Sequence, residues 1–398
     1  MRKLGTTLGG VALAAGLLLG APAFGYDAVV EKKVFEMPSY RTTGGETIKN
    51  VRIGWESYGT LNAAKDNVIL ITHYFSGNSH AAGKYKPDDK APGYWDAIIG
   101  PGKPLDTDKY FIISSDTLVN LGAKDPTVVT TGPASINPDT GKPYGMGFPL
   151  VTIRDFVEVQ KALLDSLGIT SLHAVMGASM GSLQAFEWAA AHPGMVKRVI
   201  PVIGGAEASA FLIAWLNVWA APVKLDPNWN NGNYYDGPAP NRGLAEALKV
   251  VTLQANHWQW FDGRFGRKPA EEGKDPRATM ANQYEVEAFL DKAAAARAAT
   301  SDANHFLYLI KANQTFVAGN GGSLDEGLAK IKAPMLLIPS ANDIVFFPDE
   351  NMRPLKDKLA AKGLKVEYTE VITGPMGHLD GVFNIAKAGE QIAAFLAR

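Results

Sequence analysis

The chain has no cysteine among its 398 residues. This absence excludes disulfide bonds and a lipid anchor attached through cysteine, so the fold must be held by its hydrophobic core, and a chain of this length can form one. An excess of charge of one sign is also missing, because 39 Lys and Arg residues face 40 Asp and Glu residues. Without a basic stripe or a basic amphipathic helix, nothing favours binding to nucleic acid or to a membrane surface.

The apolar stretch near the N-terminus is not long. It runs from about Val11 to Leu19, too short to span a bilayer, and no charged stop-transfer segment follows it. Two basic residues precede it, and the small residues Ala21 to Ala23 follow it as in a cleavage site. We therefore expect residues 1–23 to be a signal peptide, and the mature chain to be periplasmic or secreted without membrane insertion.

One motif in the middle of the chain predicts chemistry. Residues 177–181 read Gly-Ala-Ser-Met-Gly, after an apolar run and before an amphipathic helical pattern. A G-x-S-x-G between a strand and a helix predicts a nucleophile elbow, whose turn is so sharp that both flanking glycines are needed for their small size. We expect Ser179 to lie at the end of its strand, with the first amides of the next helix directed at the negative charge that develops during attack on a carbonyl.

Short strand patterns alternate with helical patterns on both sides of this motif, which predicts a mostly parallel sheet covered by helices. The strand patterns lie at residues 33–35, 51–55, 68–71, 110–113, 172–176, 199–203, 335–338 and 366–368. One helix is expected to start at Thr152, with Asp155 completing a capping box, and another to close the chain over residues 383–396.

The pattern changes between residues 206 and 332. Strand patterns are missing there, helical ones dominate, and five of the eight tryptophans occur, at positions 215, 219, 229, 258 and 260. These rings form either an ordinary helical core or the lining of an apolar pocket over the serine, and both readings stay open. We expect residues 24–205 and 333–398 to form the sheet domain, and residues 206–332 to be an inserted helical lid.

A serine hydroxyl needs a base to take its proton and an acid to orient that base. In a fold with this elbow the chain order is serine, then acid, then histidine. His378 is our candidate base, because it lies in a Gly-rich loop after the last strand pattern. The other histidines that follow the elbow fit less well, one as a helix cap and two within the lid: His192, His257 and His305.

The acid should lie at the end of the preceding strand pattern, the one at residues 335–338. Asp343 has that position, at the end of the segment 339–343. Asp349 and Glu350 are the rivals, but they come after Pro348 and look like the start of a helix.

The negative charge on the reacting oxygen needs two backbone N–H donors. The loop after the third strand pattern supplies one in this fold, and we assign Phe75, with Met180 as its partner. His73 and His80 in the same loop resemble metal ligands, but no spacing of His and carboxylate residues supports a metal. Hydrogen bonding is the preferred role for both, and we expect neither a metal nor a cofactor.

With these residues placed, the chain resembles the homoserine O-acetyltransferase-like family of α/β hydrolases from about Val29 to the C-terminus. The resemblance implies the α/β-hydrolase fold and the same triad, Ser179, Asp343 and His378. The matching runs are residues 100–108 (GPGKPLDTD), 132–138 (GPASINP), 141–145 (GKPYG), 152–155 (TIRD), 177–181 (GASMG) and 226–230 (DPNWN).

The residues that bind the amino acid in that family do not carry over. Family acetyltransferases hold the homoserine carboxylate with an arginine on the first lid helix, where this chain has Ala220. They also place an aspartate directly after the catalytic histidine, where this chain has Leu379. A buried arginine–carboxylate pair is geometrically demanding, so its loss should remove recognition of a zwitterion. Trp215 and Trp219 on the same stretch favour an apolar group in the pocket instead.

The leading hypothesis is an exported serine carboxylesterase that forms an acyl-enzyme on Ser179 and acts on small neutral esters with a short acyl group. Export agrees with hydrolysis, because acetyl-CoA is a cytoplasmic metabolite. The alternative is an acyltransferase of the family type with a different acceptor, which would differ in excluding water from the acyl-enzyme. A non-catalytic binding protein is the third reading, and the complete Ser/Asp/His set argues against it. The sequence leaves the oligomeric state open, with a homodimer as the candidate assembly.

Overall fold

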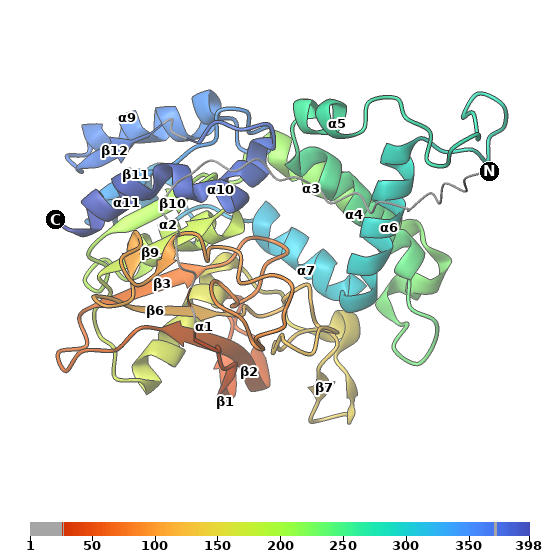
Figure 1. Cartoon of the computed structure of the whole chain (residues 1–398). Coiled ribbons are helices and arrows are strands. Elements are labelled where there is room, and N and C mark those ends of the chain that lie inside the picture. The colour runs from red at the N-terminus through yellow and green to blue at the C-terminus, as the bar shows by residue number, and fades with distance from the viewer. Residues whose placement is uncertain (1–25, 27, 370–371) are drawn as a thin grey trace, which may run out of the picture.

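The structure is a computed structural model that describes residues 26, 28–369 and 372–398. The expected signal peptide, residues 1–23, lies outside the described residues. The sheet domain and the helices of the expected lid lie side by side in Figure 1.

The centre of the molecule is an eight-stranded sheet in the order β1-β2-β6-β3-β9-β10-β11-β12. Its first three strands pair antiparallel, and every pair from β6 onward is parallel. The strands are β1 (Lys33–Arg41), β2 (Thr47–Tyr58), β3 (Val68–Thr72), β6 (Phe111–Ser115), β9 (Ala174–Ala178), β10 (Val199–Val202), β11 (Met335–Leu337) and β12 (Val366–Tyr368). Two small pairs lie outside it: β4 (Ile99–Gly100) with β5 (Leu105–Asp106), and β7 (Ile136–Asn137) with β8 (Lys142–Pro143).

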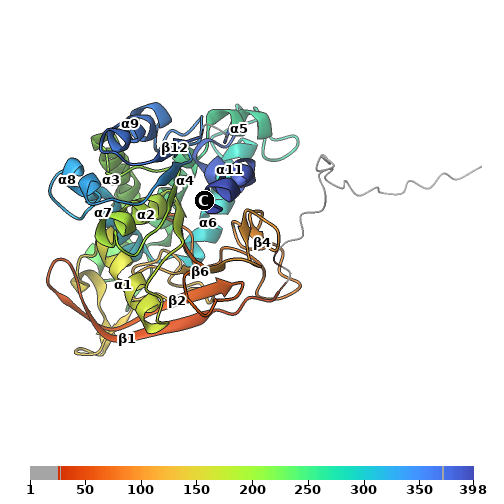
Figure 2. The same ribbon diagram turned by 90° about the vertical axis from the view of Figure 1, so that its left-hand side faces the viewer.

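Both faces of the sheet are covered, as Figure 2 shows with α1 and α2 on one side and α11 on the other. The central strand β3 explains why, since Val68 and Leu70 belong to one buried cluster and Ile69 and Ile71 to another. The helices of the sheet domain are α1 (Ile153–Ser166), α2 (Met180–Ala191), α9 (Arg353–Ala361), α10 (Asp380–Phe383) and α11 (Gly389–Leu396). A strand that is apolar on both sides requires such double covering, and this confirms the predicted layers.

Between β10 and β11 the named elements are helical. They are α3 (Ala210–Leu225), α4 (Asn241–Ala255), α5 (Trp258–Arg264), α6 (Glu285–Thr300), α7 (Ala303–Gln314) and α8 (Leu324–Ala329), with a 3₁₀ helix (Pro227–Gly232) between α3 and α4. Helix α4 packs on α3 and α6, and α3 also packs on α7. These helices fall within the segment expected to be the lid, residues 206–332, and the division into a core and a lid stays a prediction.

Two local expectations have opposite outcomes. The start of α1 has the predicted capping box, because Asp155 Oδ2 accepts from the Thr152 amide at 2.7 Å and from its hydroxyl at 2.9 Å. The single closing helix over residues 383–396 is wrong. The chain forms α10, then a short 3₁₀ turn (Ile385–Ala388) and then α11, because the backbone leaves helical dihedral angles at Asn384 (φ −115°, ψ 17°) and at Ala388 (φ −96°, ψ 8°).

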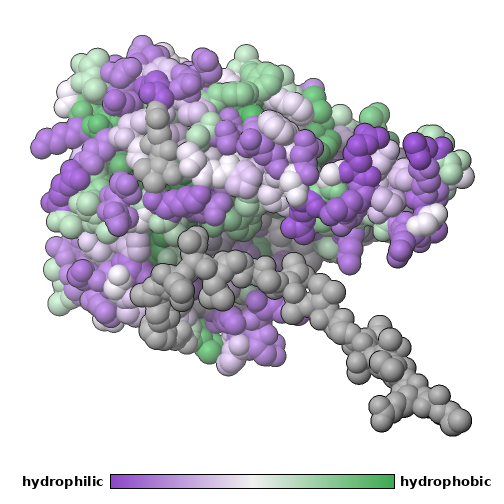
Figure 3. Space-filling view, turned by 45° about the horizontal axis from the view of Figure 1, so that its top comes forward, coloured by the Kyte–Doolittle hydropathy of each residue, from purple (hydrophilic) through white to green (hydrophobic). Residues whose placement is uncertain are grey.

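The face of the molecule in Figure 3 mixes hydrophilic and hydrophobic side chains, in keeping with the balanced charge of the sequence. Across the part of the chain that the structure describes, no helix is both long enough and apolar enough to span a bilayer.

Candidate active site

Ser179 lies in the turn between β9 and α2, and its backbone has φ 57° and ψ −120°. Non-glycine residues rarely adopt a positive φ, so the turn is strained, as a nucleophile elbow requires. The two glycines have no room for a side chain. A Cβ on Gly177 would lie 2.0 Å from Thr72 Oγ1, and one on Gly181 would lie 2.0 Å from the Thr72 carbonyl oxygen. The predicted steric need for glycine at both positions is confirmed, and Thr72 is its cause.

The structure brings Ser179, His378 and Asp343 into one chain of hydrogen bonds. His378 Nε2 lies 2.8 Å from Ser179 Oγ, and His378 Nδ1 lies 2.8 Å from Asp343 Oδ2. The other oxygen of Asp343 accepts the amides of Val345 at 2.8 Å and Phe346 at 3.0 Å. A carboxylate held in this way keeps the proton on Nδ1, so Nε2 is free to accept the serine proton.

His378 is largely enclosed. Only 6% of its surface is exposed, and the ring of Phe346 lies over it at a centroid distance of 6.0 Å. Phe346 was not singled out in the sequence, because an aromatic ring three residues after an acid has no distinguishing pattern. Its contact limits the orientations that the imidazole can adopt.

Among the rival residues, His257 lies beside the loop of His378, where its amide donates to the Met376 carbonyl at 3.3 Å. The others lie in different surroundings. His192 caps α2 and its Nε2 is 3.4 Å from Glu158. The buried His305 donates from Nδ1 to the Asn120 carbonyl at 2.8 Å, and its Nε2 accepts the Ala134 amide. Asp349 forms an exposed ion pair with Arg353 at 2.8 Å.

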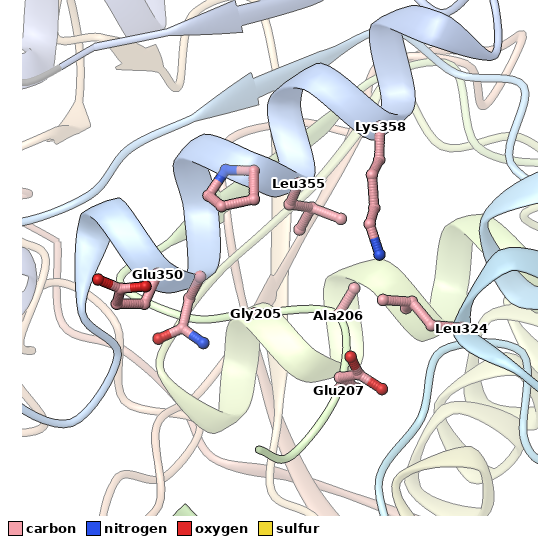
Figure 4. Close-up of a pocket in the computed structure, with 9 residues that line it drawn as sticks. Gly205, Ala206, Glu207, Leu324, Glu350, Leu355 and Lys358 are labelled. Carbon is pink, nitrogen blue, oxygen red and sulfur yellow. The ribbon is translucent and has the colours of Figure 1, made fainter. Parts of the chain in front are cut away.

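Glu350 also lies apart, at a small pocket beside α9 with a volume of about 90 Å³ (Figure 4). Glu207 and Lys358 are further charged residues in its lining, which includes no member of the triad among the described residues.

The backbone amides of Phe75 and Met180, which we assigned to the oxyanion site, belong to two segments that are hydrogen-bonded to each other. Thr72 Oγ1, at the end of β3, donates to the Gly181 carbonyl at 2.7 Å, and Gln184 Nε2 donates to the His73 carbonyl at 3.3 Å. Phe75 follows in this loop, and Met180 is the first residue of α2, where an amide has no intrahelical acceptor. Their role as oxyanion donors stays a proposal.

His73 and His80 are hydrogen-bonded, in line with the role preferred for them. His73 Nδ1 lies 2.8 Å from the Tyr74 carbonyl and Nε2 lies 3.3 Å from Asn120 Nδ2, and burial lowers the pKa of His73 to about 4. His80 Nδ1 lies 3.0 Å from Glu56. The searched part of the chain, which is the described residues, contains no cluster of three or more His, Cys, Asp or Glu side chains suited to a metal.

Glu56 is the centre of a buried charge network beneath this loop. It accepts the Tyr58 hydroxyl at 2.8 Å, and it lies 3.0 Å from Lys32 Nζ. Tyr58 in turn accepts the amides of Ala81 and Ala82 at 2.9 and 3.1 Å. Burial alone would raise the pKa of Glu56, but the hydrogen bond from His80, the charge of Lys32 and a bond from Tyr85 lower it to about 2.

We expect Glu56→Gln to lower the free energy of unfolding at pH 7 by about 3 kcal/mol, because it leaves Lys32 with a weaker set of partners. The folded-state pKa of Glu56 is depressed, so its stabilisation is complete above about pH 4.5 and is lost as the pH falls towards 2. Urea unfolding followed by circular dichroism from pH 7 to 3 measures this. The gap between the two proteins should narrow as the pH falls, and a gap that does not change with pH would contradict the assignment.

The expected pocket residues differ in their surroundings. Trp219 is 6% exposed, and its ring meets the ring of Phe75 edge to face at 5.5 Å. Trp215 is half-buried and packs on Phe211 at 6.2 Å. Leu379, beside His378, is half-buried. Trp219 therefore reaches the proposed oxyanion loop through a contact that the sequence did not specify.

Ala220 is 2% exposed and borders an apolar cavity of about 510 Å³ between α3 and α7. The lining of this cavity includes no triad residue among those that the structure describes. A place for Ala220 in the substrate pocket therefore stays a prediction.

Known proteins resemble this chain over most of its length. The family described as alpha/beta hydrolase fold matches residues 103–384. The homoserine O-acetyltransferase of Symbiobacterium thermophilum is 39% identical over 355 residues, which are 88% of this chain and 90% of that protein. That of Methanococcoides burtonii is 40% identical over 332 residues, which are 83% of this chain and 66% of that protein. The chain belongs to the homoserine O-acetyltransferase-like family of α/β hydrolases.

Two solved structures of this family have the same architecture. Esterase E22 is 52% identical with a TM-score of 0.88, and the match covers 92% of this chain and 100% of that one. Homoserine O-acetyltransferase from Bacillus anthracis is 36% identical with a TM-score of 0.88, over 93% of this chain and 98% of that one. The predicted fold class and family are thus confirmed, and the chain is an enzyme of the α/β hydrolase superfamily.

Proposed function

We propose that the protein is a serine ester hydrolase that works through an acyl-enzyme on Ser179. The observation that carries the proposal is the hydrogen-bonded chain of Ser179, His378 and Asp343, with two contacts of 2.8 Å. The Ser179 hydroxyl attacks the ester carbonyl while His378 Nε2 takes its proton. The amides of Phe75 and Met180 stabilise the negative oxygen of the tetrahedral intermediate.

The intermediate then collapses, and the bond to the alcohol breaks. His378 gives its proton to the leaving alcohol, and the acyl group stays on Ser179. A water molecule transfers a proton to His378 Nε2 and attacks the acyl carbonyl, which releases the acid and restores the serine.

The substrate that we propose is a small neutral ester with a short acyl group. Ala220 and Leu379 offer no charge where family acetyltransferases bind an amino acid. A carboxylate and an ammonium in a pocket beside Trp219 would be desolvated without partners, at a cost of several kcal/mol each. A neutral ester meets no such penalty.

Acyl transfer to an acceptor other than homoserine is the second candidate. The names of the relatives at 36–40% identity favour it, because they are homoserine O-acetyltransferases. The name of the 52% identical structure supports hydrolysis. Both reactions use the same acyl-enzyme and differ in whether water or another alcohol receives the acyl group.

Product analysis separates the two candidates. We expect hydrolysis of p-nitrophenyl esters, with acetate to butyrate best, and no O-acetylhomoserine from acetyl-CoA and homoserine. Homoserine should also not inhibit ester hydrolysis at millimolar concentration, because its two charges would be unpaired. The same assay with added neutral alcohols detects transfer to another acceptor. Appreciable O-acetylhomoserine without ester hydrolysis would overturn the proposal.

Export is part of the proposal and rests on the sequence of residues 1–23. We expect protein recovered from the periplasm or the medium to lack about 23 to 25 residues, as intact mass spectrometry would show. Full-length protein found only in the cytoplasm would favour the acyltransferase, because acetyl-CoA would then be available. The homodimer stays a prediction, which light scattering after size exclusion tests.

A further inference from the structure

The end of α4 lies between the two loops that carry the proposed chemistry. On one side, the His257 amide donates to the Met376 carbonyl at 3.3 Å, and a Cβ on Gly377 would lie 3.1 Å from His257 Cβ. On the other side, Trp219 Nε1 donates to Gln254 Oε1 at 2.8 Å, and the Trp219 ring meets Phe75. The segment 254–257 therefore connects the surroundings of the oxyanion loop with the loop of His378.

Two neutral amide side chains in this segment are buried, and each forms a hydrogen bond with only one of its two polar atoms. Gln254 and Asn256 are each 3% exposed. Gln254 accepts from Trp219, but its Nε2 has no partner among the described residues. Asn256 Nδ2 donates to the Thr252 carbonyl at 2.9 Å, while its Oδ1 has no partner among the same residues.

The identity of the free atoms follows from their neighbours. An indole N–H only donates, so the oxygen of Gln254 must face Trp219 and the NH₂ group is the free end. A carbonyl only accepts, so the NH₂ group of Asn256 must face Thr252 and the oxygen is the free end. Arg297 Nη1 donates to Thr252 Oγ1 at 3.0 Å, which ties this turn of α4 to α6.

A buried polar atom without a partner costs on the order of 1–3 kcal/mol, and folded proteins contain few of them. Here a free donor and a free acceptor occur two residues apart in the chain, in a segment that contacts both Trp219 and the loop of His378. Neither group carries a charge. The combination suits a hydroxyl, which accepts one hydrogen bond and donates another.

We propose that Gln254 and Asn256 form a polar subsite that selects esters bearing an uncharged hydroxyl group. Gln254 Nε2 donates to the hydroxyl oxygen, and Asn256 Oδ1 accepts its proton. The inference rests on the proposed function and narrows its substrate class from neutral esters to neutral hydroxylated ones. Trp219 orients the Gln254 amide, and Thr252 orients that of Asn256.

Two pairs of isosteric esters test the subsite, since each pair differs by a methyl group replaced with a hydroxyl. Propyl acetate and 2-hydroxyethyl acetate place the hydroxyl on the alcohol side, and methyl butanoate and methyl 3-hydroxypropanoate place it on the acyl side. We expect the wild-type protein to prefer the hydroxylated ester in one pair, by kcat/KM. Gln254→Met and Asn256→Leu should each lower that preference about tenfold, the weight of one hydrogen bond.

Thr252→Val is the matched control. It disturbs the same turn of α4 and removes the contact with Arg297, but it leaves both amide groups in place, so the preference should stay. Equal losses for both esters of each pair in Gln254→Met and Asn256→Leu would show a structural role and overturn the subsite. A wild-type preference for a carboxylate-bearing ester such as monomethyl succinate would overturn it too, and would direct attention to Arg297.

Binding to the Ser179→Ala variant separates this inference from the proposed function. Ligand-observed NMR can rank the dissociation constants of the same ester pairs without turnover. Tighter binding of a hydroxylated ester, lost in Gln254→Met, would support the subsite even if the wild-type protein hydrolysed no ester. No preference in binding, together with active hydrolysis, would overturn the subsite and leave the esterase proposal standing.

Discussion

Ser179→Ala should lower kcat for p-nitrophenyl acetate and butyrate by a factor on the order of 10⁴ to 10⁶. The variant loses the atom that forms the acyl-enzyme, and members of a triad act as a unit, so the rest of the site cannot compensate. The fold should be unchanged, since alanine fits wherever serine does and the amide of residue 179 still donates to the Val202 carbonyl, at 2.9 Å in the wild-type structure. Circular dichroism and thermal unfolding check that point.

Ser182→Ala is the matched control, because it lies one turn into the same helix. Its hydroxyl is buried and has no hydrogen-bond partner among the residues described, so removing it should leave activity within about twofold. A serine-directed phosphonate should label Ser179 alone, which peptide mass spectrometry would locate. Labelling at another residue, or turnover that survives Ser179→Ala, would contradict the acyl-enzyme mechanism and revive the reading of a binding protein.

The parts of the fold that the sequence predicted are those set by local patterns. The apolar run 68–71 indicated a strand buried on both faces, and all four side chains are fully buried. The elbow motif predicted its own turn, because the two glycines and the strained serine are requirements of one short segment. The order of serine, acid and histidine along the chain, together with the loop position of His378 and the strand-end position of Asp343, identified the three residues that the structure joins.

The parts that could not be predicted depend on contacts between distant segments. Gln254 is an ordinary residue on a helix until its oxygen meets Trp219, and no periodicity reports that contact. The role of Thr72 arises only when β3 lies beside β9. The charge network of Glu56 joins strand and loop residues that are far apart in the chain, with separations of up to 29 residues. Local propensity cannot encode such pairings, because many other partners would satisfy the same pattern.

The break in the closing helix has a similar origin. The apolar spacing over residues 383–396 fits a single helix, yet the chain turns after α10. Trp95 Nε1 lies 3.4 Å from the Gly381 carbonyl, and a Cβ on Gly381 would lie 2.6 Å from Ile203. Helix α10 is therefore packed tightly against other segments, and this tertiary packing prevails over the local helical pattern.

Asp343→Asn should lower kcat for ester hydrolysis by about 10⁴, the size of effect that the same change has in other triads. The reason lies in the hydrogen bonds of Asp343. Its Oδ1 accepts the amides of Val345 and Phe346, so in the variant the oxygen of the asparagine must face those donors. The NH₂ group then faces His378 Nδ1, which has to become an acceptor. The proton moves to Nε2, and the imidazole can no longer accept the proton of Ser179.

The measurement is kcat for p-nitrophenyl butyrate in Asp343→Asn beside Asp349→Asn and Glu350→Gln. The last two should change kcat by less than about twofold, because Asp349 pairs with Arg353 at the surface and Glu350 lies at the pocket beside α9. The KM of Asp343→Asn should stay near that of the wild-type protein, since the carboxylate is buried behind the imidazole and acts through it. If Glu350→Gln or Asp349→Asn were the more damaging change, the acid of the triad would be misassigned.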